Sequence, residues 1–170
     1  RVTAVIDHAA REAGAREIVS RWADGSETRT DWAGIRRDAL RMAQALQRLG
    51  LAPGDKVASL AMNHSRHLVS WYGVAGMGGV LHTVNPRLFD DQLEYIVNHA
   101  EDRVLCYDAA FQPIVDRMRD RWPTVEHYIC YDSRANAMAF EDWIGAEDGA
   151  FSWVEGAETD PCMICYTSGT

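Results

Sequence analysis

The chain has 170 residues, 47% of them hydrophobic, so it is about one domain long and can bury a core. Its 25 acidic residues outnumber 17 basic ones, for a net charge of −8, and no basic cluster predicts nucleic acid or an anionic membrane as a partner. Residues 67–86 are uncharged but contain glycines, histidines and a final Asn-Pro pair, so we expect a buried helix and strand there, not an integral membrane segment.

The first thirty residues predict a short helix followed by a β-hairpin. The helix is expected over residues 3–13. Two strand-like segments, residues 18–22 and 27–29, flank Asp24-Gly25, a typical hairpin turn.

A strong amphipathic helix follows the hairpin. Thr30 is its expected N-cap, and Gly50 supplies the stop. Apolar residues recur between them at spacings of three and four, namely Trp32, Ile35, Ala39, Met42, Ala43, Leu46 and Leu49. A turn at residues 53–55 then leads into an apolar strand over residues 57–62.

Helices and strands alternate along the rest of the chain. We expect helices over residues 64–79, from residue 90, over 111–121 and over 137–144, with Asn63 as the first N-cap. We expect strands over residues 80–84, 104–107, 125–130 and 163–166, the last one short and buried after an acidic loop at 145–158. Gly73, Gly76 and Gly79 fall near one face, where they would allow close packing against a neighbour. This alternation predicts an α/β fold with a mostly parallel sheet flanked by helices.

The sequence holds four cysteines, Cys106, Cys130, Cys162 and Cys165, which do not suggest a secreted disulfide scaffold in a chain of this size. Cys162 and Cys165 have the CxxC spacing, but they lie in a strand-like run, whereas a redox CxxC normally opens a helix. A zinc site would need two more ligands, and His64 and His67 are the only local pair with a usable spacing. We therefore predict buried, reduced cysteines and no metal site. No signal-peptide pattern follows Arg1, so we expect a cytoplasmic protein.

The last strand empties into Thr167, Ser168, Gly169 and Thr170. Small residues let backbone N–H groups face a phosphate, and hydroxyl groups add further donors. No GxxxxGK[ST] pattern is present, so this is not a Walker A loop. Ligands of parallel α/β sheets bind beyond the carboxyl ends of the strands, which favours an anion-binding loop here. An ordinary strand-to-turn exit is the alternative.

Seven landmarks occur in a characteristic order: residues 30–32 opening a helix, then 50–57, 62–65, 76–80, 84–88, the helix 90–96, and Tyr-Thr-Ser-Gly-Thr at 166–170. In this order the chain resembles the N-terminal part of an acyl-CoA synthetase of the adenylate-forming superfamily, which includes firefly luciferase and peptide-synthetase adenylation domains. Residues 82–89 followed by 98–102 are most similar to fatty-acyl-CoA synthetases of the medium- and long-chain type.

The resemblance implies that residues 1–170 are the N-terminal part of the large, AMP-binding (adenylation) domain, incomplete and without the C-terminal domain. It implies a small-molecule carboxylic acid, ATP with Mg²⁺, and coenzyme A as reactants, with an acyl-adenylate as intermediate. Carried over, Thr167, Ser168, Gly169 and Thr170 would contact the ATP phosphates. A homodimer, and the identity of the acid, stay open.

The resemblance also implies that this chain holds no catalytic residue, because the family's adenylation lysine lies in the C-terminal domain. The five histidines that could suggest a base are each expected to be structural or exposed; they are His64, His67, His82, His99 and His127. We therefore expect the 170-residue chain alone to be inactive. The alternatives are a non-catalytic, stand-alone binding or assembly module, an adenylation domain serving a carrier protein, and a luciferase-like oxidase.

Overall fold

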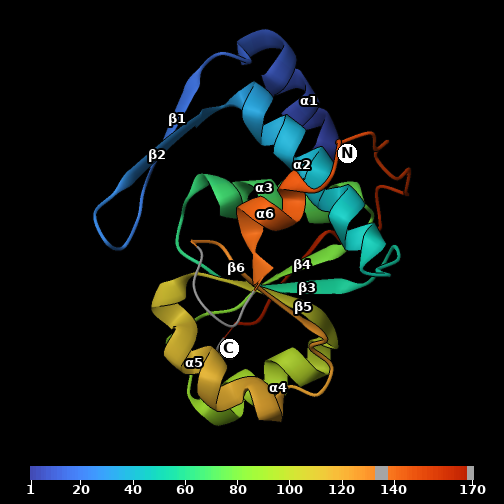
Figure 1. The fold of residues 1–170 in the computed structure, drawn as a ribbon. Helices are drawn as coiled ribbons and strands as arrows, with labels where there is room; N and C mark the ends of the chain where they lie inside the picture. The colour runs from blue at the N-terminus through green and yellow to red at the C-terminus, as the bar shows by residue number, and fades with distance from the viewer. Residues whose placement is uncertain (133–137, 168–170) are drawn as a thin grey trace.

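The computed structural model describes residues 1–132 and 138–167 of the chain (Figure 1). Its centre is a six-stranded sheet in the order β7-β6-β5-β3-β4-β8, in which every neighbouring pair is parallel. The strands are β3 (Lys56–Leu60), β4 (Val80–Thr83), β5 (Asp102–Tyr107), β6 (His127–Cys130), β7 (Met138–Ala139) and β8 (Met163–Cys165). The predicted α/β fold with a mostly parallel sheet is confirmed.

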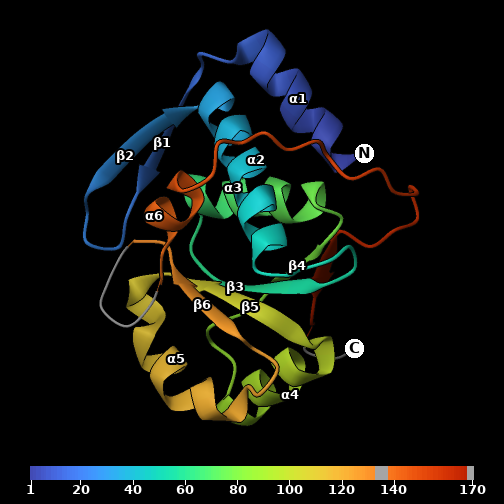
Figure 2. The same cartoon turned by 45° about the vertical axis from the view of Figure 1, so that its right-hand side comes forward.

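Helices cover both faces of this sheet, as Figures 1 and 2 show from two directions. On one face lie α1 (Val2–Ala13), α2 (Trp32–Arg48), α3 (Ser65–Gly76) and α6 (Phe140–Gly145). On the other lie α4 (Asp90–Ala100) and α5 (Gln112–Met118). A separate antiparallel hairpin of β1 (Glu17–Arg21) and β2 (Glu27–Asp31) extends to one side, with Asp24-Gly25 in its turn as predicted.

Two hydrophobic cores form because successive strand residues point to opposite faces of the sheet. The core under α2 and α3 contains Ile35, Met42, Leu46, Val57, Leu81 and Val104, none more than 1% exposed. The core under α4 and α5 contains Leu60, Leu93, Val97, Leu105, Val115 and Trp122, again none more than 1% exposed. Each such burial stabilises the fold by about 1.5–3 kcal/mol before entropy is counted, so the helices are held firmly against the strands.

The glycines of α3 allow close approach, as the sequence indicates. A Cβ atom on Gly73 would lie 3.0 Å from the backbone oxygen of Ala39 in α2. One on Gly76 would lie 2.3 Å from the ring of Trp153, in the segment after α6. The helix ends at Gly76, so Gly79 belongs to the turn before β4.

Two predicted helix caps are wrong by one residue. Thr30 lies in β2, paired with Ile18, and Asp31 caps α2 by accepting a hydrogen bond from the Gly34 N–H at 2.7 Å. Likewise His64, and not Asn63, caps α3 through its ring nitrogen. In both cases the cap is the residue whose extended backbone aims its side chain at the first turn.

Three other predicted elements also differ from the structure. The expected helix 111–121 is α5 flanked by short 3₁₀ turns at 109–111 and 119–121. The expected helix 137–144 begins only at Phe140, because residues 138–139 pair with β6; residue 137 lies outside the described part. The last strand is not buried: Met163 is 42% exposed, because β8 lies at the sheet edge with only β4 beside it in the described chain.

The predicted burial of the cysteines is half right. Cys106 and Cys130 are buried, whereas Cys162 is half-buried and Cys165 is exposed on the edge strand β8. Residues 67–86 form most of α3, then β4, as expected. Among residues 1–132 and 138–167, no helix has both the length and the apolar character needed to cross a bilayer.

Candidate functional site

The carboxyl ends of the parallel strands meet at one edge of the sheet, which we call the carboxyl edge. Thr167 lies here, exposed, two residues after the end of β8. Thr83 is the register partner of Cys165, so Thr167 leaves the sheet beside the end of β4. The other three predicted loop residues, Ser168, Gly169 and Thr170, lie outside the described residues. The structure thus places the start of the predicted loop at the edge where such sheets bind ligands.

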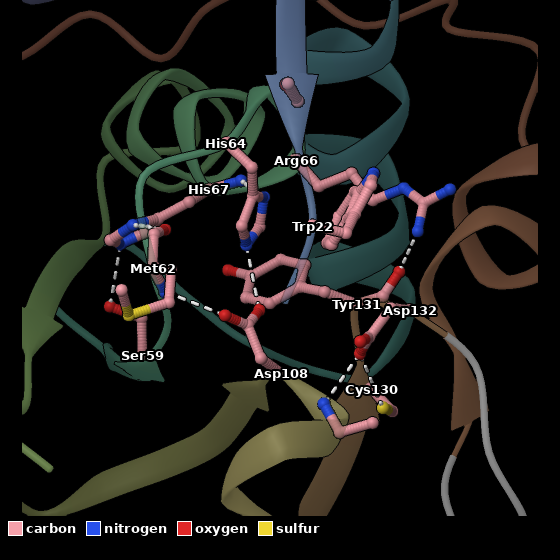
Figure 3. Close-up of polar contacts among 12 residues, drawn as sticks. Trp22, Ser59, Met62, His64, Arg66, His67, Asp108, Cys130, Tyr131 and Asp132 are labelled. Carbon is pink, nitrogen blue, oxygen red and sulfur yellow. Dashed lines mark hydrogen bonds and ion pairs between the residues drawn. The ribbon is translucent and has the colours of Figure 1, made fainter. Parts of the chain in front are cut away.

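Asp108 occupies the same edge at the end of β5 (Figure 3). Its side chain is nearly buried and accepts the backbone N–H of Met62 at 2.7 Å. Its second oxygen lies 2.8 Å from Nε2 of His64. These two contacts tie the segment that follows β3 to the end of β5, and thereby fix the shape of the carboxyl edge.

The hydrogen bonds of His64 determine its tautomer. Its Nδ1 faces the backbone N–H of His67 at 3.1 Å and must accept, because a backbone N–H can only donate. The proton therefore sits on Nε2, which donates to the Asp108 carboxylate. With both nitrogens engaged in the neutral ring, His64 has no free lone pair for a proton transfer or a metal ion. Its role is to cap α3.

His67, which is half-buried, joins the same network. Its Nδ1 lies 3.2 Å from the carbonyl oxygen of Met62 and donates to it, so Nε2 accepts from Ser59 Oγ at 3.1 Å. Burial, and next the nearby His64, hold the pKa of His67 below its ordinary value of 6.5, so the ring is neutral at pH 7. Ser59 is only 1% exposed within β3, so this Ser–His pair offers no accessible nucleophile.

The β1–β2 hairpin is anchored to this network through Trp22. The Trp22 ring lies 4.4 Å from the ring of His64, and the guanidinium of Arg66 lies 4.8 Å over it on the other side. Arg66 also donates to the carbonyl oxygen of Tyr131 at the end of β6 and to Glu141 of α6 at 2.6 Å. Such stacking adds a cation–π attraction to the ion pair, so the hairpin is held beside the carboxyl edge.

A groove of about 510 Å³ lies between the hairpin and α3. Its apolar lining is Ile18, Val19, Leu68 and Trp71, and its polar lining is Ser20, Asn63, His64, Ser65, His67 and Thr83. A second hollow, of about 380 Å³, lies at the opposite edge, where Pro53, Gly79 and Cys162 precede β3, β4 and β8. Ligands of open α/β sheets bind at the carboxyl ends of the strands, and the groove beside Thr83 lies at that end.

A second histidine–aspartate pair, His82 and Asp102, lies inside the fold. Nδ1 of His82 in β4 is 2.6 Å from Oδ2 of Asp102 in β5, and both side chains are fully buried. Burial raises the pKa of Asp102, and the His82 contact partly opposes that rise. Within the described chain, His82 Nε2 and Asp102 Oδ1 have no hydrogen-bond partner. Neither side chain can reach a substrate in solvent, so any role of the pair is through the residues packed against it.

Those surroundings include Tyr166, the residue before Thr167. The Tyr166 ring lies 5.0 Å from that of His82, and its hydroxyl lies 2.6 Å from Nδ1 of His99, an exposed residue of α4. His127 is half-buried, 4.0 Å from Glu126. The five histidines thus occupy the structural or exposed positions expected from the sequence.

Sequence reasoning missed the partners Asp108, Asp102 and Tyr166. Asp108 directly follows a buried strand, the one available signal for it; the contacts of Asp102 and Tyr166 join residues 20 and 67 positions apart. Within the described ranges, no three His, Cys, Asp or Glu side chains are grouped so that they could hold a metal ion.

Comparison with known proteins gives a consistent result. The chain is 44% identical to the 3-methylmercaptopropionyl-CoA ligase of Ruegeria pomeroyi, over 99% of this chain and 33% of that protein. It is 40% identical to the medium-chain-fatty-acid–CoA ligase of Ectopseudomonas oleovorans, over 99% of this chain and 32% of that one. It is also 40% identical to the long-chain-fatty-acid–CoA ligase of Thermus thermophilus, over 97% and 30%. The chain therefore spans about a third of the length of these relatives.

Solved structures agree with these relatives. The fatty acyl CoA synthetase of Mycobacterium tuberculosis superposes with a TM-score of 0.82 at 26% identity, over 98% of this chain and 32% of that one. Residues 6–170, nearly the whole chain, match the family described as AMP-binding enzyme. The fold, the ordered motifs and this match together show that the chain belongs to the AMP-binding enzyme family, within the adenylate-forming superfamily.

Proposed function

We propose that the full-length gene product is an acyl-CoA ligase that acts on a medium- or long-chain carboxylic acid, or a thioether analogue of one. The three curated relatives, at 40–44% identity, carry ligase names with such acids. In this proposal residues 1–170 belong to the large, AMP-binding domain, and the enzyme works in the cytoplasm, where free thiols such as Cys162 and Cys165 stay reduced.

The proposed reaction has two steps. A carboxylate oxygen of the acid attacks the α-phosphorus of ATP, and the bond from that phosphorus to the bridging oxygen breaks, which gives the acyl-adenylate and pyrophosphate. The thiolate of coenzyme A then attacks the acyl carbon, the bond from that carbon to the phosphate oxygen breaks, and AMP leaves. The thiol proton passes to solvent.

This chain would serve the first step through the phosphates. In the proposal Thr167, Ser168, Gly169 and Thr170 hold the ATP phosphates with hydroxyl and backbone N–H donors. The single observation that carries the proposal is the position of Thr167, exposed at the carboxyl edge of a parallel sheet, in a chain so similar to CoA ligases. Asp108 is committed to Met62 and His64, so we do not propose it as a Mg²⁺ ligand, and in this proposal the ion accompanies ATP.

The test uses the full-length gene product and the double variant Thr167→Ala/Ser168→Ala. Loss of two hydrogen bonds to charged oxygens, each worth about 1.5–3 kcal/mol, lowers kcat/KM for ATP on the order of a hundredfold or more. The KM for the acid should change little. The matched control is Ser152→Ala/Thr159→Ala, which removes the same groups from exposed loop positions.

Acid-dependent ATP–pyrophosphate exchange and thioester formation are measured across straight-chain acids and 3-methylmercaptopropionate. An unchanged ATP dependence in the double variant would remove this loop from the nucleotide site. No exchange with any acid would refute the ligase proposal. Exchange without coenzyme A thioester would favour an adenylation domain that serves a carrier protein.

A further inference from the structure

Tyr166 connects the end of β8 to helix α4. Its hydroxyl lies 2.6 Å from Nδ1 of His99, and the two rings meet edge to face at 5.9 Å. Burial raises the pKa of Tyr166 above its ordinary value of 10.0, so at pH 7 the hydroxyl keeps its proton and forms a hydrogen bond with Nδ1. This contact spans 67 residues of sequence and ends one residue before Thr167.

The need for such an anchor follows from the shape of β8. The strand has only three residues, and in the described chain it pairs with β4 alone. Among the described residues, the register ends at the pair Thr83 and Cys165, and no ladder contact continues to Thr167. The side-chain contacts of Tyr166 with His99 and His82 then tie the chain to neighbouring elements one residue before Thr167.

His99 is well placed to fix that side chain. Leu93 and Val97, on the inner side of α4, are fully buried, which holds the helix against the sheet. The ring of Tyr95, one turn earlier, stacks on His99 with centroids 5.2 Å apart and planes 19° apart. This stacking keeps the imidazole oriented, so that Nδ1 can face Tyr166.

The other side of Tyr166 rests on the buried histidine–aspartate pair. The His82 ring lies 5.0 Å from the Tyr166 ring, and Asp102 holds His82 by its Nδ1. Because both members of the pair are fully buried, the ring of His82 cannot swing away. Tyr166 is thus fixed from two sides, by α4 and by the interior of the sheet.

We propose that Tyr166 is a positioning residue for the phosphate-binding loop, held by His99 and seated on His82, and that it sets the direction of Thr167 toward the nucleotide phosphates. This inference rests on the function proposed for the loop. Tyr166 touches no phosphate itself, so its loss misplaces the loop but removes none of the loop's donors.

The first test compares variants of the full-length gene product in ATP-dependent acid activation. Tyr166→Phe deletes only the hydroxyl, and His99→Ala deletes its hydrogen-bond partner. Each should lower kcat/KM for ATP roughly two- to tenfold, the range for one net hydrogen bond, and leave the KM for the acid unchanged. The double variant should be no worse than either single one, because both changes break the same contact. His99→Gln, whose side-chain amide can accept from or donate to the hydroxyl, should restore most of the loss.

His8→Ala is the matched control for His99→Ala, because it removes the same imidazole from an exposed position in α1 and should leave the kinetics unchanged. Additive losses in the double variant would overturn the inference, because they would separate Tyr166 from His99. A loss that falls equally on ATP and on the acid would also overturn it, since it would indicate general damage to the fold.

The second test needs no activity. Hydrogen exchange of residues 163–167, followed by mass spectrometry, should accelerate in Tyr166→Phe and His99→Ala but not in His8→Ala. If the wild type activates no acid, the proposed function fails, but faster hydrogen exchange in the two variants would still support the contact of Tyr166 as an anchor. If the enzyme is active and the hydrogen exchange of residues 163–167 is the same in all variants, the positioning role of Tyr166 is refuted.

Discussion

Replacing Asp108 by Asn should loosen the carboxyl edge without changing its shape. The wild-type carboxylate accepts two hydrogen bonds, from the Met62 N–H and from Nε2 of His64. Met62 and His64 face different oxygens of Asp108, and Asn has an NH₂ group in place of one of them, so it can accept only one of the two bonds. The His64 ring cannot adapt, because its Nδ1 is committed to the His67 N–H. A donor then faces a donor, whichever way the amide turns.

The size of the effect follows from that count. One hydrogen bond to a buried carboxylate is lost, at a cost of about 1.5–3 kcal/mol. Every 1.4 kcal/mol is a factor of about ten in an equilibrium constant, so local opening should become about ten- to a hundredfold more frequent. Because amide exchange reports local opening, the protection of the Met62 and His67 amides should fall by that factor.

Native-state hydrogen exchange of the full-length gene product measures this protection directly. Asp120→Asn is the control, since it makes the same chemical change at an exposed position and should alter protection less than about twofold, as surface changes usually do. If Asp108→Asn keeps wild-type protection at Met62 and His67, the carboxylate does not hold the carboxyl edge together, and our reading of this network is wrong.

Three further predictions follow from the packing, the charges and the sheet edge. Gly76→Ala should lower the free energy of unfolding by about 1–3 kcal/mol through overpacking, because the new methyl group meets Trp153. Gly145→Ala, whose methyl group would meet no atom within 4 Å, should be neutral or slightly stabilising. Thermal melting tests both variants. His67→Gln should reduce the loss of stability that the wild type shows below pH 6.5. Burial lowers the folded-state pKa of His67, so in that pH range the unfolded chain binds more protons and the wild type loses stability as the pH falls. Denaturant titrations at pH 7 and pH 5 would contradict this if both proteins lost the same free energy of unfolding. The isolated chain 1–170 should show no ATP–pyrophosphate exchange, and exchange above background would contradict this. It should also self-associate through the edge strand β8, and a monodisperse monomer in light scattering would contradict that.

Much of the fold could be predicted because its signals are local. The apolar spacing from Trp32 to Leu49 defined α2, and the alternation of helical and strand-like segments defined the parallel sheet. The errors came where a tertiary partner decides the local structure. Residues 138–139 extend because β6 lies beside them, and Met163 is exposed because β8 is an edge strand.

The candidate site shows the same division. Thr167 could be placed from its sequence context alone, because a loop after a parallel strand lies at the carboxyl edge. The residues that shape that edge could not be found in this way. Asp108 and His64 are 44 residues apart, and Tyr166 and His99 are 67 apart, so neither pair follows any local spacing. The cap of α3 was misplaced on Asn63 for this reason, since His64 is oriented from one side by α3 and from the other by Asp108.

The central claim is that the loop beginning at Thr167 holds the phosphates of ATP at the carboxyl edge. A crystal structure of the full-length gene product with a non-hydrolysable ATP analogue tests it most directly. We predict phosphate oxygens within hydrogen-bond distance of residues 167–170, beside the end of β4. A bound nucleotide whose phosphates lie away from these residues, for instance in the hollow near Gly79 where the strands begin, would contradict the account.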